Sequence, residues 1–113
     1  MNNQDIRLDL LLKIELNPEY TQRKLSKEIG VSLGKVNYCI KKLAEKGLIK
    51  ISNFKKNPNK AHYVYILTPS GVEEKTRLTF SFLKRKIQEF ELLKDEIKKL
   101  KESAEKIQKK VVL

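Results

Sequence analysis

Residues 25–32 of the chain read Leu-Ser-Lys-Glu-Ile-Gly-Val-Ser. Leu25 and Ile29 are four residues apart, which places both side chains on one face of a short helix. Gly30 has the residue type that adopts the left-handed conformation at a helix end, and Ser32 has that of the N-cap of a following helix. The stretch therefore predicts two helices joined by a tight turn.

Helices are expected on both sides of this turn. Residues 4–16 carry apolar side chains at helical spacing, and Pro18 ends that helix because the residue before a proline avoids the helical region. Thr21 is the expected N-cap of the short helix. The third helix is expected over residues 32–46, with Gly47 as its stop. Its inward-facing stripe is Val36, Ile40 and Leu43.

After the third helix the pattern becomes extended. Residues 48–54 and 61–68 are rich in Ile, Val, Tyr and Phe, which predicts two strands. The polar segment 55–60 between them contains lysines and a proline, and it predicts a hairpin turn with a basic tip. Thr68 and Pro69 fit the cap and the first residue of a last helix, which meets no later proline and runs for about 40 residues.

This order of elements predicts a mainly α fold with a small β-hairpin (α+β). Residues 1–68 are expected to form a winged helix-turn-helix, and residues 69–113 a long C-terminal coiled-coil helix. With 113 residues the chain has room for one such domain and an appendage.

The formal net charge is +11, and it is unevenly distributed along the chain. Between Tyr20 and His62 eleven lysines and arginines stand against two acidic residues, whereas the segment before Tyr20 is net acidic. A generally lysine-rich surface would spread the charge evenly. The excess in the middle third instead predicts a surface for a polyanion, and double-stranded DNA is the expected partner.

The inward stripe of the third helix determines which residues face outward, because successive residues turn by about 100°. Tyr38 and Lys41 fall near the outward pole, and Lys35 and Asn37 fall on its flanks. In helix-turn-helix proteins the N-terminal half of this helix enters the major groove, where lysine can donate to guanine and asparagine can pair with adenine. The alternative is that these residues are ordinary solvated polar groups.

Two further segments complete the expected interface. The N-terminus of the second helix, residues 21–23, can hold a phosphate at the positive end of the helix dipole. The hairpin tip suits contacts to the backbone or the minor groove, which give affinity rather than sequence choice. The predicted DNA-binding residues are Thr21, Gln22, Arg23, Ser32, Gly34, Lys35, Asn37, Tyr38, Lys41, Lys42, Lys55, Lys56, Asn57, Asn59 and Lys60.

Residues 31–39, which read Val-Ser-Leu-Gly-Lys-Val-Asn-Tyr-Cys, and residues 67–71, which read Leu-Thr-Pro-Ser-Gly, resemble the MarR-type winged-helix regulators. The resemblance covers nearly the whole chain and is closest to a small subgroup associated with exopolysaccharide gene clusters. It implies transcriptional control, with polysaccharide genes as the target. The chain departs from the family in being short, with one dimerisation helix in place of the usual two. The sequence does not identify an effector ligand.

The last helix carries an apolar heptad seam that predicts a homodimer. Only Lys86 interrupts its nine a and d positions. Glutamates at g and lysines at e, five residues further on, favour a parallel pair. The alternative is a helix that folds back on its own domain. The predicted dimerisation residues are Leu83, Phe90, Leu93, Ile97, Leu100, Ala104, Ile107 and Val111.

Several other classes of function lack support in the sequence. Cys39 is the single cysteine and is expected to be a small buried residue rather than a redox switch, and His62 has no second ligand type around it. The sequence predicts no enzyme, metal or cofactor, and it predicts a cytoplasmic protein without a membrane segment. The alternatives to a sequence-specific regulator are a protein–protein interaction module and a nonspecific nucleic-acid binder.

Overall fold

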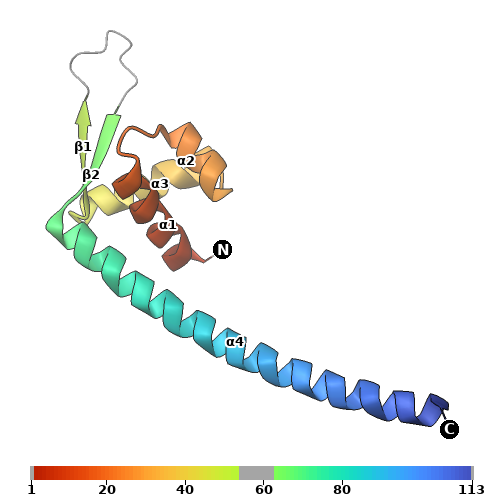
Figure 1. The fold of residues 1–113 in the computed structure, drawn as a ribbon. Coiled ribbons are helices and arrows are strands. Elements are labelled where there is room, and N and C mark those ends of the chain that lie inside the picture. Colours follow the sequence, from red (N-terminus) through yellow and green to blue (C-terminus); the bar gives the residue numbers. More distant parts are fainter. Residues whose placement is uncertain (1, 54–62, 113) are drawn as a thin grey trace. The chain divides into compact units, whose positions relative to one another are not determined.

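The computed structural model describes residues 2–53 and 63–112 of the chain (Figure 1). The mainly α fold with a small hairpin and a long last helix, predicted from the sequence, is confirmed. The predicted hairpin turn, residues 55–60, lies outside the described residues. The elements in chain order are α1 (Asn3–Leu16), α2 (Gln22–Ile29), α3 (Leu33–Glu45), β1 (Ile49–Asn53), β2 (Tyr63–Leu67) and α4 (Pro69–Val112).

Short-range hydrogen bonds set the ends of the helices. The Asn2 side chain accepts a hydrogen bond from the Asp5 amide at 2.8 Å and so caps α1. The Thr21 and Ser32 hydroxyls each accept from the amide three residues on, at 3.1 Å, which confirms both predicted N-caps. Gly30 ends α2 in the left-handed region with φ 78°, as its residue type predicted.

The two strands pair antiparallel and are tied to the helical part of the domain. Ile51 lies opposite Tyr65 in the register, and the Tyr65 side chain is buried in the hydrophobic core with residues of the helices. The Tyr65 amide also donates to the Pro18 carbonyl at 3.0 Å, in the turn between α1 and α2. The sheet is therefore held to the α1–α2 turn by a hydrogen bond as well as by packing.

One hydrophobic core joins α1, α2, α3, both strands and the first turns of α4. Every position predicted for the inward stripe of α3 is fully buried, and Leu25 of α2 is buried beside them. Leu78 of α4 is 3% exposed and belongs to the same core. The buried set is Ile6, Leu8, Leu10, Leu11, Ile14, Leu25, Val36, Ile40, Leu43, Leu48, Ile49, Tyr65 and Leu78.

The beginning of α4 is seated on the turn that follows α3. Thr68 caps α4, since its hydroxyl accepts from the Gly71 amide at 3.0 Å, and it also donates to the Gly47 carbonyl at 2.6 Å. The Thr68 amide donates to the Leu48 carbonyl at 3.0 Å. Gly71 passes so close to this turn that a Cβ there would lie 2.0 Å from the Leu48 carbonyl oxygen.

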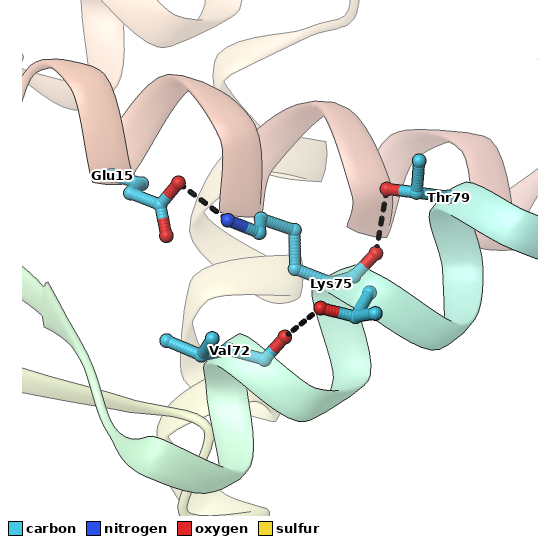
Figure 2. A network of polar contacts seen from close by, with 5 residues as sticks. Glu15, Val72, Lys75 and Thr79 are labelled. Atoms are coloured by element: carbon cyan, nitrogen blue, oxygen red, sulfur yellow. Dashed lines mark hydrogen bonds and ion pairs between the residues drawn. The ribbon is translucent and has the colours of Figure 1, made fainter.

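A half-buried ion pair joins the C-terminal end of α1 to α4 (Figure 2). The Lys75 ammonium lies 2.5 Å from the Glu15 carboxylate, and the pair connects residues 60 positions apart. Figure 2 also shows the Thr79 hydroxyl donating to the Lys75 carbonyl at 2.7 Å within α4. This pair adds an electrostatic contact to the packing of Leu78.

The chain divides into two compact units, residues 1–79 and residues 80–113. The first eleven residues of α4 thus belong to the unit that contains the winged helix-turn-helix, because Leu78 is part of its core. The functional division at residue 68, predicted from the sequence, stays a prediction. The second unit is the remainder of α4, a helix whose side chains are nearly all exposed.

Candidate nucleic-acid interface

α3 presents a polar face to solvent that contains several of the predicted DNA contacts. Tyr38 is 56% exposed in spite of its aromatic ring, and Gly34 and Lys41 are also exposed. Lys35 and Asn37 are half-buried on opposite flanks, because Lys35 reaches α1 and Asn37 reaches α2. The structure thus places these five residues on one side of the helix, away from its buried stripe.

The Tyr38 ring has two lysines against it. The ammonium groups of Lys35 and Lys42 each lie 5.6 Å from the ring centroid. Cation–π contacts at this distance stabilise exposed charges by about 0.5–1 kcal/mol. An outward-facing aromatic ring therefore has a partner within the chain itself, while it keeps two positive charges at the surface of α3.

Asn37 is held by a chain of hydrogen bonds that begins in the core. Its side-chain amide donates to Gln22 Oε1 at 3.1 Å, and Gln22 Nε2 donates to the Tyr65 hydroxyl at 3.3 Å. Tyr65 is 3% exposed, so the chain links a buried residue of β2 to the exposed side of α3. Asn37 keeps its carbonyl oxygen and one N–H for other partners.

A surface groove of about 430 Å³ lies where α2 begins, between α3 and β2. It brings the three predicted residues at the start of α2 next to Asn37. Thr21 and Arg23 are exposed there, whereas Gln22 is half-buried. The groove is lined by Thr21, Gln22, Arg23, Leu33, Asn37, Tyr63 and Tyr65.

A second cavity, of about 340 Å³, lies on the other flank of α3, facing α1. We call it the basic cavity, because four of its side chains are cationic and none of its described lining residues carries a carboxylate. Asn3, Arg7 and Lys46 belong to it and were not among the predicted site residues. The basic cavity is lined by Asn3, Arg7, Lys35, Tyr38, Cys39, Lys42, Leu43 and Lys46.

The charge distribution along the sequence did not predict that Arg7 and Lys46 would line this cavity. Arg7 lies in the segment before Tyr20, which is net acidic and carried no expectation of a site. Its sequence spacing to α3 gives no sign that the two meet, so only the packing of α1 on α3 reveals the contact. Lys46 was expected as the end of the third helix and as one of the eleven central cations, but not as a DNA contact. Cys39, expected to be buried, is half-buried in the cavity wall.

The remaining predicted contacts divide between the helix N-caps and the hairpin. The Ser32 hydroxyl is engaged as an N-cap acceptor and remains a free donor. Lys42 is exposed and forms an ion pair with Glu45 at 3.4 Å. The predicted hairpin contacts lie outside the described residues; they are Lys55, Lys56, Asn57, Asn59 and Lys60.

The second unit carries an apolar face along α4. The large apolar residues among those predicted for dimerisation are all exposed. Ile97 is the least exposed of them, at 44%, and Val111 is the most exposed, at 79%. Within the helix, Lys86 and Arg85 reach Glu89 at 3.0 and 3.9 Å, and Lys99 reaches Asp95 at 3.2 Å. Such exposed pairs contribute about 0.3–0.5 kcal/mol each, so they stabilise the helix modestly.

Two other kinds of site are absent from residues 2–53 and 63–112. No group of three or more potential metal-ligating side chains is present there. No helix in these ranges has the length and apolar content that crossing a membrane requires.

Comparison with known proteins agrees with the fold. Residues 4–50 match the protein family described as winged helix-turn-helix DNA-binding. The search of curated proteins found no match for this sequence.

Solved structures of other proteins, among them the following three, are similar in fold to this one. The PcaV transcriptional regulator from Streptomyces coelicolor is 17% identical with a TM-score of 0.63, over 88% of this chain and 78% of that one. A mutant MarR from E. coli complexed with operator DNA is 25% identical with a TM-score of 0.53, over 64% and 50%. Sso10a-2, a DNA-binding protein from Sulfolobus solfataricus, is 16% identical with a TM-score of 0.63, over 88% and 96%.

The extent of these matches differs between the neighbours. The chain spans 54% of the length of a MarR family transcription regulator of known structure, with 17% identity and a TM-score of 0.61. It covers Sso10a-2 almost completely. Residues 4–50 thus match a winged helix-turn-helix DNA-binding family, and the fold is shared with MarR-family regulators at low sequence identity.

Proposed function

We propose that this protein is a sequence-specific transcriptional regulator of the MarR type, which binds double-stranded DNA as a homodimer and has no enzymatic activity. The observation that carries the proposal is the exposed side of α3, where Lys35, Tyr38 and Lys41 lie together within a matched DNA-binding domain. Structural neighbours bound to DNA support it, among them FabT from Streptococcus pneumoniae, 24% identical with a TM-score of 0.56.

In this proposal α3 enters the major groove. Lys41, at its outward pole, reaches base edges, and Asn37 reads an adjacent base from the α2 flank. The start of α2 and the predicted hairpin residues 55–60 contact phosphates, which adds affinity at low salt. Residues 1–68 would then serve DNA binding and residues 69–113 dimerisation.

Dimerisation is proposed to use the apolar face of α4. A solvent-exposed helix with such a seam gains free energy by covering it, about 25 cal/mol for each Å² of apolar surface buried. A parallel pair would place Glu89 opposite Lys94 and Glu96 opposite Lys101 of a second copy. Two α3 helices about one helical turn of DNA apart would then read a palindrome.

The proposal includes control of polysaccharide genes, and this part of it rests on the sequence resemblance alone. The measurement that tests this part is a protection assay, which maps whether the protein binds the DNA upstream of such genes. The cytoplasmic location predicted from the sequence likewise stays a prediction.

A second candidate is a DNA-binding protein without sequence preference. This candidate is supported by the similarity to Sso10a-2, which is named only as a DNA-binding protein and which this chain covers almost completely. The two candidates differ in one measurable quantity, the ratio of specific to nonspecific affinity. A sequence-specific regulator binds its site at least about 10³-fold more tightly than random duplex at physiological salt.

The decisive experiment is selection of bound duplexes from a random-sequence library by the full chain. We expect a palindromic consensus that binds at least about 10³-fold more tightly than unselected duplex. Binding with no enriched sequence would favour the second candidate. An absence of any duplex binding would refute both and point to a protein–protein interaction module.

The dimer has a matched pair of test variants. Ile97→Asp places a charge in the apolar face of α4, whereas Lys98→Asp places the same side chain one residue further, outside the seam. We expect Ile97→Asp to give monomers by light scattering and Lys98→Asp to remain dimeric. A dimer that survives Ile97→Asp would show that the seam is wrong.

A further inference from the structure

The basic cavity has the composition of an anion site. Arg7, Lys35, Lys42 and Lys46 supply four positive charges, and Asn3 and the Tyr38 hydroxyl add polar atoms. Cys39 and Leu43 are the apolar residues of its lining. One of these cations, Lys42, forms an ion pair with the carboxylate of Glu45. A ligand of this cavity therefore carries negative charge.

Two of the cations are already positioned without a ligand. Lys35 Nζ donates to Asn3 Oδ1 at 3.1 Å, and its ammonium lies 5.6 Å from the Tyr38 ring centroid. Lys42 lies at the same distance from that ring, and its ion pair with Glu45 is exposed on both sides. An exposed pair of this kind is worth about 0–1 kcal/mol, so an incoming anion can displace it at little cost.

The position of the cavity indicates which kind of anion can bind there. An α-helix is about 10–12 Å wide and the major groove about 12 Å, so a helix in the groove has a phosphate backbone along each flank. The start of α2 and its groove occupy one flank of α3, and the basic cavity occupies the other. Each flank would thus meet one strand of the duplex.

We infer that the basic cavity is a phosphate-binding subsite, with Arg7 and Lys46 as unassigned contacts to the DNA backbone strand on the α1 side of α3. This inference rests on the proposed function. Lys35 and Lys46 are eleven residues apart, about 16 Å along the helix axis, which is further than a single small anion can bridge. A backbone strand can follow that row of charges, and free phosphate can occupy only part of it.

The test is the salt dependence of binding to duplex DNA by the full chain. For B-DNA the slope of log affinity against log salt falls by about 0.9 for each phosphate contact removed. We expect Arg7→Ala and Lys46→Ala each to lower the slope by about 0.9, so that each variant loses about 3.5-fold less affinity than wild type between 50 and 200 mM salt. The consensus selected from a random library should not change, because these contacts carry no base readout.

Matched variants separate lost charge from lost folding. Arg7→Lys keeps the positive charge and should keep the wild-type slope. Arg77→Ala removes an arginine that contacts Glu74 at the start of α4, outside the basic cavity, and it should leave the slope unchanged. Thermal unfolding of each variant identifies any that is misfolded, and Lys46→Ala, at an exposed position, then carries the test.

The outcomes distinguish this inference from the proposed function. Wild-type binding with an unchanged slope in Arg7→Ala and Lys46→Ala would overturn the inference and leave the proposed function standing. No DNA binding by the wild type would overturn the proposed function itself. Inorganic phosphate that shifts the Arg7 and Cys39 NMR signals, together with unchanged slopes in both variants, would assign the cavity to a free anion and overturn the backbone contact.

Discussion

Gly71 is the position where adding one methyl group is expected to change the stability of the fold most. A Cβ atom there would lie 2.0 Å from the Leu48 carbonyl oxygen and 3.1 Å from its carbonyl carbon, whereas ordinary contact begins at 3.4 Å. Both groups belong to the backbone, so no side-chain rotation can relieve the overlap. Gly71→Ala must therefore push the first turn of α4 away from the turn after α3.

The size of the effect follows from three contributions. Forcing an extra methyl into a packed site costs about 1–3 kcal/mol, and the upper end applies because backbone has to move. The hydrogen bond from Thr68 to the Leu48 carbonyl, 3.0 Å long, is worth about 1 kcal/mol and would be strained. Alanine offsets about 1 kcal/mol by its helix preference over glycine. The net loss is about 3 kcal/mol, which lowers Tm by more than about 10 °C in a domain of this size.

The assay is thermal unfolding followed by circular dichroism, at one protein concentration for all variants. Gly34→Ala is the matched control, because Gly34 lies in the first turn of α3 and a Cβ there meets nothing within 4 Å. We expect its Tm to equal or slightly exceed that of the wild type. A Tm of Gly71→Ala at or above the wild-type value would refute the reasoning about the close approach of Gly71 to Leu48.

Three further predictions concern base readout, an ion pair and a half-buried carboxyl. Tyr65→Phe removes the hydroxyl that anchors Gln22 and Asn37, so base preference at one position of the selected site should relax while the salt slope stays unchanged; a consensus as sharp as that of the wild type would argue against this positioning role. Glu15→Gln removes the charge that faces Lys75 and should cost about 1 kcal/mol by denaturant unfolding, an effect that shrinks in 1 M salt; equal losses at low and high salt would show that charge is not the cause. Burial raises the pKa of Asp9, Lys13 lowers it and Asp5 raises it, with burial the largest effect. A carboxyl with a raised pKa holds its proton longer in the fold, so its contribution to stability declines as pH rises through the range between its unfolded and folded pKa. Asp9→Asn should therefore have a higher Tm than the wild type at pH 7 and lose that advantage in acid, and the opposite pH trend would contradict the raised pKa.

The helices and their ends could be predicted from the sequence because the interactions that set them are local. Thr21 and Ser32 accept hydrogen bonds from amides three residues away, and Gly30 adopts its conformation within a single turn. The buried stripes of α1 and α3 follow from helical spacing alone. For these features, residue type and spacing contain the physical cause.

The parts of the candidate site that could not be predicted depend on residues far apart in the sequence. Asn37 is 15 positions from Gln22, and Gln22 is 43 positions from Tyr65, yet hydrogen bonds join them. Arg7 reaches the flank of α3 only because α1 packs there. Tyr38 was predicted to be outward-facing and is, but the two lysines that flank its ring depend on side-chain conformations that spacing alone does not give.

The hydrogen bond between the Tyr65 amide and the Pro18 carbonyl affects how the paired strands β1 and β2 can move. A hairpin attached to a domain only by its two chain ends can tilt as a rigid body relative to that domain. Here β2 is bonded to β1 along one edge and to the α1–α2 turn along the other, and the Tyr65 ring is inserted among the helices. The paired strands and that turn should therefore open in one cooperative event, so that amide hydrogen exchange at Tyr65 reports unfolding of the whole domain rather than local fraying.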